Sequence, residues 1–213
     1  MLRDKIRFLS ENGAYLYLLS ELQWQCQKIH NRFLAAKLGV RRVQIGPGAW
    51  LRGLSAIQIG ENFSTGPGLR LDAITLSGEH KRRPLIVIGD NVFVNSWCHI
   101  TATNSVEIGD NVLMGSKVIV TDHQHGQYSG PHTSPEIPPA LRPLDLDKKV
   151  VIGRNVWLGD GVVVMPGSEI GEGSIIGANS VVVGKVPPFT IAAGIPSKPL
   201  KRYDFQIKEW VRV

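Results

Sequence analysis

Two histidines close together in the sequence, His123 and His125, are the residues best placed to do chemistry. They follow the aliphatic run Lys117–Val120 and open a long segment that is rich in proline. Functional side chains are often found where a rigid element meets a loop. A neutral imidazole accepts a proton near neutral pH, and a weakly nucleophilic hydroxyl group needs such a base. We therefore predict a general base at this junction.

The other candidate chemistry is weaker. Four more histidines are His30, His80, His99 and His132. We expect His30 on a helix and His99 pointing out of a repeating element, both as ordinary surface residues. The two cysteines, Cys26 and Cys98, lack metal-ligand spacing, so we predict neither a metal site nor a disulfide framework.

The charge of the chain predicts an anionic partner. The 213 residues carry a formal net charge of +6 and suffice for one domain. No nucleic-acid motif accompanies the basic residues, which favours phosphate-bearing ligands over nucleic acid. A signal peptide is not apparent, and no stretch approaches the ~18 apolar residues of a membrane span. We expect a cytoplasmic protein.

An internal repeat must position these residues. Large aliphatic residues recur at intervals of six, and the longest run is Ile152, Leu158, Val164, Ile170, Ile176 and Val182. A small or β-branched residue follows four places after most of them. This period fits neither a helix nor plain strand alternation. It predicts a coil with three short faces, whose stacked turns bury a continuous aliphatic ladder. A β-sandwich with many turns is the alternative.

Two segments depart from the repeat. Residues 121–149 contain five prolines and are expected to protrude as a functional loop. Residues 13–38 show an apolar stripe at helical spacing, formed by Tyr15, Leu18, Leu19, Leu22, Cys26, Ile29 and Phe33. We expect this helix to cover the open end of the coil or to pack on a neighbouring subunit. A helix lying on a membrane surface is the alternative, because basic residues follow in its later half.

The repeat resembles the hexapeptide-repeat acyltransferases, over about residues 43–202. The closing phrase Val186–Pro196 is similar to the segment with which that family leaves its coil, and Val120–His123 is similar to the stretch that holds its catalytic histidine. The resemblance implies an all-β solenoid, a left-handed parallel β-helix that forms a homotrimer. It places a helical cap at 1–42, the β-helix at 43–202 and a C-terminal tail at 203–213.

The resemblance also implies roles for individual residues. It makes His123 the catalytic base, with His125 as the alternative, and places Asn95 on the acceptor side. A carboxylate that some relatives have eight residues later is absent here, because Ala102 and Thr103 stand there. The residues expected to hold acetyl-coenzyme A are Trp157, Asp160, Ala178, Lys185, Lys198 and Lys201.

These observations predict an acetyl-coenzyme A-dependent O-acetyltransferase that acts directly, without an acyl-enzyme, on a sugar hydroxyl in surface-polysaccharide biosynthesis. One alternative is an N-acetyltransferase for an amino sugar, which would need less help from a base. Alternatives of another class are a γ-type zinc carbonic anhydrase, whose ligand spacing His123 and His125 do not match, and a scaffold without activity.

Overall fold

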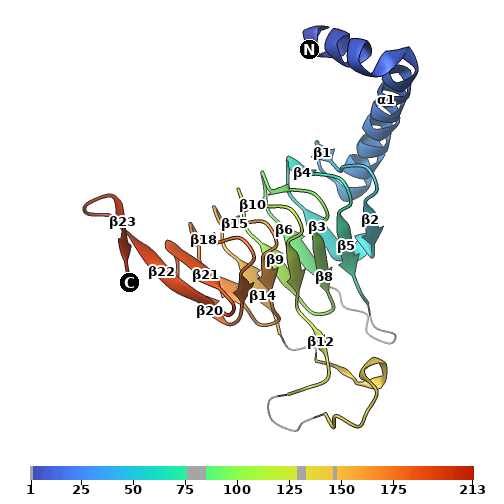
Figure 1. The fold of residues 1–213 in the computed structure, drawn as a ribbon. Coiled ribbons are helices and arrows are strands. Elements are labelled where there is room, and N and C mark those ends of the chain that lie inside the picture. The colour runs from blue at the N-terminus through green and yellow to red at the C-terminus, as the bar shows by residue number, and fades with distance from the viewer. Residues whose placement is uncertain (1, 76–84, 129–132, 146–147) are drawn as a thin grey trace.

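Three parallel sheets form the faces of a stacked coil in the computed structural model, which describes residues 2–75, 85–128, 133–145 and 148–213 (Figure 1). Each turn of the chain adds one short strand to each sheet, because the aliphatic repeat supplies one inward side chain per face. The predicted three-faced solenoid is therefore confirmed, and the strands do not form a sandwich.

The sheets are named A, B and C, and their strands are given in spatial order. Sheet A contains β1 (Val43–Gln44), β4 (Phe63–Thr65), β7 (Phe93–Val94), β10 (Leu113–Met114), β15 (Trp157–Leu158), β18 (Ile175–Ile176), β21 (Thr190–Gly194), β22 (Ser197–Asp204) and β23 (Glu209–Arg212). Sheet B contains β19 (Val181–Val182), β16 (Val163–Val164), β11 (Ile119–Thr121), β8 (His99–Ala102), β5 (Arg70–Ala73) and β2 (Trp50–Arg52). Sheet C contains β20 (Lys185–Val186), β17 (Glu169–Ile170), β14 (Val150–Ile152), β9 (Val106–Ile108), β6 (Ile86–Ile88) and β3 (Ile57–Ile59).

The residues of the six-residue period fill the interior of the coil. Each of them is at most 2% exposed, as the set Ile88, Val94, Ile100, Ile108, Met114, Val120, Ile152, Leu158, Val164, Ile170, Ile176 and Val182 shows. Strands above and below pair in register, so Leu158 stacks on Met114 and under Ile176. The aliphatic column is the core of the molecule, and it holds the outward side chains of each strand in fixed rows.

The corner between sheets C and A shows why asparagine recurs in the repeat. Asn62, Asn91, Asn111 and Asn155 all have φ between 56° and 60°, a left-handed conformation that asparagine tolerates better than most residues. Their side chains also bond to one another, with distances of 2.9, 3.3 and 3.1 Å along the column. Backbone conformation and side-chain bonding therefore favour the same residue at this corner.

Truncating one member of the aliphatic column tests its packing. Ile176→Val removes a methylene group from a side chain that is 0% exposed, and we expect it to lower the free energy of unfolding by about 0.5–1.5 kcal/mol. Val183→Ala is the control, because Val183 is 60% exposed and its truncation should change stability by less than about 0.5 kcal/mol. Denaturant unfolding of the two variants measures both. Equal losses would show that Ile176 does not lie in a tightly packed column.

The N-terminal helix is longer than expected and turns its apolar stripe away from the coil. Helix α1 covers Leu2–Leu38, although helical periodicity was evident only from residue 13. Near its end it packs Leu34 and Ala35 against the core of the coil, and beside them Gln27 Nε2 and Asn31 Nδ2 donate to the carbonyl of Ile45 at 2.9 and 3.3 Å. The predicted stripe remains open to solvent in the single chain, since Phe33 is 74% exposed. The described part of the chain contains no helix apolar enough to cross a bilayer.

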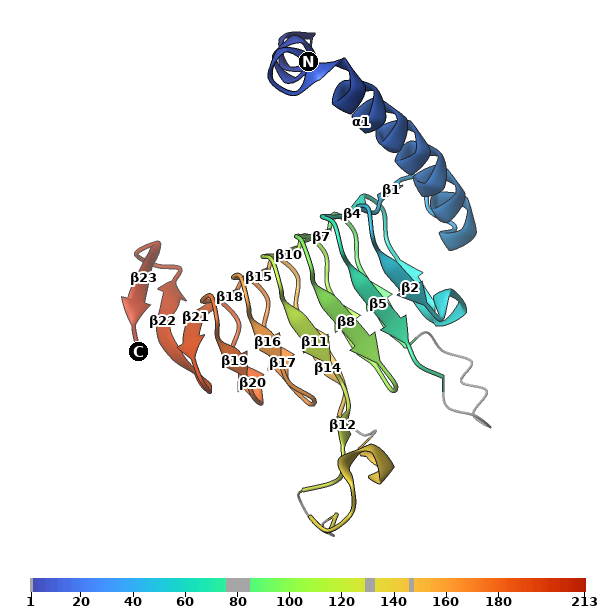
Figure 2. The same cartoon turned by 45° about the vertical axis from the view of Figure 1, so that its right-hand side comes forward.

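The long loop leaves the coil after β11, as predicted, and Figure 2 shows it hanging below the stack. Its described part contains an antiparallel pair, β12 (Gln124–His125) with β13 (Leu144–Asp145), and a 3-10 turn at Pro139–Leu141. The C-terminal tail is also ordered. β22 continues through the expected boundary at residue 202 and pairs with β23 as a hairpin at the end of sheet A.

The outward rows of the three sheets differ in polarity. In sheet A the register aligns the apolar side chains of Phe93, Leu113, Trp157, Ile175 and Ile191. In sheet B the later strands align Ile119, Val163 and Val181. Sheet C instead carries ion pairs, Lys149 with Glu107 and Lys185 with Glu169, at 2.7 Å each. Two faces of the coil are thus suited to packing against protein, and one is suited to water.

Candidate active site

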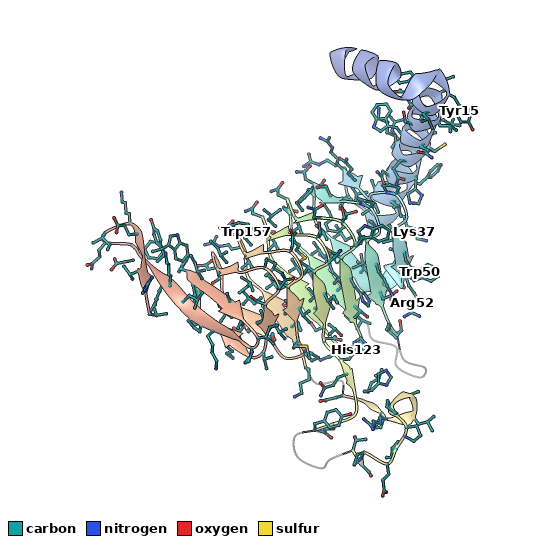
Figure 3. All side chains as sticks on the ribbon, viewed as in Figure 1. Tyr15, Lys37, Trp50, Arg52, His123 and Trp157 are labelled. Atoms are coloured by element: carbon teal, nitrogen blue, oxygen red, sulfur yellow. The ribbon has the colours of Figure 1, made fainter. Side chains whose placement is uncertain are left out.

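His123 lies directly after the carboxyl end of β11, where the protruding loop leaves the coil (Figure 3). Its ring is partly buried, with a side chain 15% exposed. Thr121, the last residue of β11, places its hydroxyl 3.4 Å from His123 Nδ1 and donates to the backbone carbonyl of His123 at 3.2 Å. The rigid strand thus fixes the start of the loop and the imidazole with it.

Asp122 orients the imidazole of His123. Its Oδ1 lies 2.9 Å from His123 Nδ1. Because an ionised carboxylate can only accept, Nδ1 carries the proton in this pair and Nε2 is left with a free lone pair. The arrangement matches that of a general base held in one tautomer by a neighbouring acid.

The carboxylate of Asp122 is held by the preceding turn of the coil. It is 0% exposed and accepts backbone N–H groups of Thr103, Asn104 and Ser105 at 2.9, 2.7 and 2.7 Å. Burial acts to raise the pKa of Asp122, but the hydrogen bond with His123 and the three backbone N–H groups outweigh it, so the pKa lies below its usual value. Asp122 is therefore an anion when His123 is neutral.

His125 is placed differently. It belongs to β12 in the loop, opposite Leu144, and its side chain is exposed. Its backbone carbonyl accepts the hydroxyl of Tyr128 at 2.7 Å. Of the two histidines at the junction, His123 has the buried acidic partner.

The expectation that His99 is a plain surface residue is wrong. Its side chain is 32% exposed, and its Nε2 is buried 4.0 Å from Asp72 Oδ2. Burial is the main cause that lowers the pKa of His99, the charge of Arg70 adds to it, and Asp72 opposes it. The electrostatic interaction with His123 also acts to lower the pKa of His99. The repeat shows that His99 points outward, but it does not show that Asp72 of the preceding turn lies beside it.

Asp72 is a buried carboxylate on the turn of the coil that precedes Ala102 and Thr103. It reaches the same face from the preceding turn, because β5 pairs with β8 in the register Asp72 to Thr101. Arg70 Nε lies 2.7 Å from Asp72 Oδ2, and Arg52 Nε lies 3.3 Å from Asp72 Oδ1. A charged cluster therefore adjoins His99 and, through it, His123.

Most of the residues expected to bind acetyl-coenzyme A gather on sheet A and its corner with sheet B. Trp157 points outward and is 49% exposed, while its neighbour Leu158 is buried, as the repeat predicts. Lys201 continues the same outward row through Ile175 and Ile191. At the corner are Asp160, whose Oδ1 accepts the backbone N–H of Ser116, and Ala178 in the next turn, while Lys198 pairs with Ala193. Lys185 lies apart on sheet C, paired with Glu169.

One chain does not bring the two halves of the candidate site together. Trp157 and His123 lie on opposite sides of the coil stack (Figure 3). Asn95 follows β7 at the corner between sheets A and B. His123 follows β11 at the opposite corner, between sheets B and C. The side chain of Asn95 accepts the backbone N–H of Ser96 at 2.9 Å.

Other described features lie away from His123. Cavities of about 770 and 680 Å³ lie between α1 and the first turns of the coil, lined by Trp24 and Gln27 among others. Within the described ranges, His, Cys, Asp and Glu side chains do not gather in threes as a metal ion would require. His80 and His132 lie outside the described residues, as does the basic run at 81–83.

Comparisons with known proteins bear on the family of the chain. Residues 149–184 match the family described as "Bacterial transferase hexapeptide (six repeats)". The chain is 47% identical over 163 residues to "Putative lipopolysaccharide biosynthesis O-acetyl transferase WbbJ" of Escherichia coli (strain K12), covering 76% of this chain and 79% of that protein. It is 33% identical over 125 residues to galactoside O-acetyltransferase of Escherichia coli (strain K12), covering 59% of this chain and 58% of that protein.

A solved structure confirms the fold. AntD, an N-acyltransferase from Bacillus cereus in complex with dTDP and 3-hydroxybutyryl-CoA, gives a TM-score of 0.63 at 22% identity, covering 78% of this chain and 83% of that chain. With the three parallel sheets, this likeness identifies the coil as a left-handed β-helix, as predicted.

Proposed function

Because the chain belongs to the hexapeptide-repeat acetyltransferases, we propose that it transfers the acetyl group of acetyl-coenzyme A to a sugar hydroxyl in the synthesis of a surface polysaccharide. The observation that carries the proposal is the pairing of His123 with the buried, ionised Asp122, directly after β11. A hydroxyl group needs such a base at neutral pH far more than an amine does. The name of the relative that is 47% identical supports a lipopolysaccharide-type acceptor.

In this mechanism the transfer is direct. Nε2 of His123 takes the proton from the acceptor hydroxyl, and the oxygen attacks the thioester carbonyl. The tetrahedral intermediate then collapses, the carbon–sulfur bond breaks, and the imidazolium of His123 returns the proton to the leaving thiolate. Asp122 stabilises that imidazolium and holds the ring in one tautomer.

The donor is expected along the outward row of sheet A. Trp157 offers an exposed apolar surface for the pantetheine arm, and Lys198 and Lys201 would neutralise the coenzyme phosphates. Asp160 and Ala178 mark the corner beside that row, where backbone groups can bond the amides of the arm. Lys185 could contact the coenzyme only from sheet C, where it pairs with Glu169.

Turnover of acetyl-coenzyme A tests the function. Purified protein is screened with simple glycosides, nucleotide sugars and extracted polysaccharide, and the product is treated with mild alkali. An ester formed on a hydroxyl group is cleaved, whereas an amide formed on an amino sugar survives. An alkali-stable product would favour the N-acetyltransferase, and the absence of coenzyme A binding by calorimetry would leave only a scaffold.

The assembly follows from the same geometry. Sheet A and the later strands of sheet B carry apolar outward rows, and the candidate donor and base groups lie on opposite sides of one chain. A homotrimer with cyclic symmetry would cover the apolar rows and bring sheet A of one chain against His123 of the next. Asn95 would reach the base in the same way.

Mixing two inactive variants tests this sharing of sites. His123→Ala removes the base, and Trp157→Glu disturbs the proposed donor row, so each homotrimer should turn over poorly. Unfolding and refolding the two together should restore activity, because some sites then receive an intact His123 from one chain and an intact Trp157 from another. Light scattering on the parent protein measures the assembly. A stable monomer, or a mixture as inactive as its parts, would contradict the shared site.

A further inference from the structure

A polar row crosses sheet B and ends at His123. The parallel register aligns Arg52 with Asp72, Asp72 with Thr101, and Thr101 with Thr121. Thr121 in turn bonds the backbone of His123. Because neighbouring strands are ~4.8 Å apart, Asp72 lies two spacings, ~10 Å, from the strand that carries the base. The row is therefore a track along which an extended ligand could lie with one end at His123.

The far end of this track is positively charged. Asp72 stands on the outward row but is 0% exposed, and the guanidinium groups of Arg52 and Arg70 pair with its two oxygens through their Nε atoms. About half of each arginine side chain stays exposed, 51% for Arg52 and 54% for Arg70. Two cations on one carboxylate leave an excess of positive charge at the surface.

The carboxylate also prepares the arginines for a ligand. Asp72 accepts a hydrogen bond from Nε of Arg70 at 2.7 Å and faces Nε of Arg52 at 3.3 Å as an ion pair, so both side chains have lost part of their rotamer freedom before a ligand binds. Arginine is the side chain best suited to the planar, two-point recognition of phosphate oxygens. The later strands of sheet B present the apolar residues Ile119, Val163 and Val181 in the adjoining row, so the charge of this sheet is confined to the strands before β11.

We propose that Arg52 and Arg70, held by Asp72, bind a phosphate or diphosphate group of the acceptor while the sugar next to it presents a hydroxyl to His123. The acceptor is thus an activated sugar, joined to a nucleotide or a lipid through phosphate, before its incorporation into a polymer. The separation of ~10 Å between β5, which carries Arg70, and β11, which leads to the base, suits one sugar ring with its neighbouring phosphate. This inference rests on the proposed function, because it names the substrate class of the same site.

Calorimetry with inorganic pyrophosphate tests the site without requiring turnover. The full-length protein is first saturated with coenzyme A, so that the donor site is filled, and pyrophosphate is then titrated at low salt. We expect binding that weakens as ionic strength rises. The variant R52Q/D72N/R70Q removes both arginines without leaving a buried carboxylate unpaired. We expect each arginine to contribute about tenfold to the affinity, as a charge-assisted contact typically does.

The chain offers a matched control. Arg154 also pairs with a carboxylate through Nε, at 2.6 Å from Glu172, and its side chain is 65% exposed. The variant R154Q/E172Q removes a comparable ion pair from another corner and should bind pyrophosphate as the parent does. If the triple variant loses its cooperative melting transition, the single variant R52Q replaces it in the test. R52Q keeps the ion pair of Arg70 with Asp72 and should still weaken pyrophosphate binding about tenfold.

The outcomes separate this site from the donor site. Pyrophosphate that fails to bind the parent, or that binds the triple variant equally well, would overturn the proposal. A loss of coenzyme A affinity as large as the loss of pyrophosphate affinity would assign the arginines to the donor instead. Failure of the parent to bind coenzyme A would contradict the proposed function, yet arginine-dependent binding of pyrophosphate would still be measurable.

Discussion

Replacing His123 with alanine is expected to lower kcat by about 10²–10⁴-fold, the usual contribution of a general base. That factor corresponds to roughly 3–5 kcal/mol of activation free energy. The substitution leaves the outward row of sheet A untouched, so the affinity for coenzyme A should stay within a few-fold of the parent. Steady-state kinetics with acetyl-coenzyme A and a reactive acceptor, together with calorimetry for the coenzyme, measure the two quantities separately.

His125→Ala is the control for this prediction. His125 lies two residues away, but its side chain is exposed in the loop. We expect its replacement to change kcat much less. A loss of turnover in His125→Ala with activity retained in His123→Ala would place the base at residue 125. If neither variant slows the reaction tenfold, base catalysis by a histidine is wrong and transfer to an amine becomes the better explanation.

Asp122→Asn should have the second largest effect on turnover. The amide is nearly the same size as the carboxylate but can donate to Nδ1 of His123, which favours the tautomer whose Nε2 is protonated and cannot act as a base. In serine proteases the corresponding change costs about 10⁴-fold in kcat. We expect about 10²–10⁴-fold here, with the acceptor KM little changed, because Asp122 acts through His123 as a positioning residue.

The pH dependence of stability checks that Asp122 is ionised. Its pKa in the folded protein lies below the unfolded value of about 3.9, so its contribution to stability is full above that pH and is lost as the pH falls through the folded pKa. Asp122→Asn also leaves backbone N–H groups without an acceptor, which typically costs about 1–3 kcal/mol. The difference in free energy of unfolding between parent and variant should therefore shrink below about pH 4. A difference that grows on acidification would mean that Asp122 is protonated in the folded protein.

The coil could be predicted from the sequence because its repeat depends only on residues close together in the chain. One aliphatic residue in six is enough to place a side chain inside, and the burial of Ile152, Leu158 and Ile170 follows directly. The loop after β11 was evident for the complementary reason, since its prolines cannot continue a parallel ladder. Trp157 was correctly expected to point outward.

The candidate site was harder to predict because it depends on register between turns. Asp122 adjoins His123 in the sequence and could have been noticed, but its bonds to residues 103–105 depend on the stacking of two turns. Asp72 lies 27 residues before His99 in the sequence and reaches it only because β5 pairs with β8. The interval between stacked residues is not constant, being 20 residues from Arg52 to Asp72 and 29 from Asp72 to Thr101, so counting in sixes does not reveal the pairing.

The N-terminal helix shows a different limit of prediction. Its apolar stripe was recognised, but the stripe does not face the coil of its own chain. Leu34 and Ala35, which lie outside the predicted stripe, pack on the coil instead, and Gln27 and Asn31 satisfy the backbone groups of Ile45 there. Hydrophobic periodicity predicts which side of a helix is apolar, but it does not predict which part of the chain, or which other molecule, packs on that side.

The position of the protruding loop has a consequence for how such proteins diversify. The strands on either side of the insertion stack as though it were absent, since β14 pairs with β9 from Val150 and Val106 onward. The entropy of closing a loop grows only slowly, by about 0.6 kcal/mol for each doubling of its length. Insertions and deletions at this point therefore cost the scaffold little, while they alter the surroundings of His123. Natural variation can in this way change acceptor recognition at nearly constant stability, which separates the evolution of specificity from that of the fold.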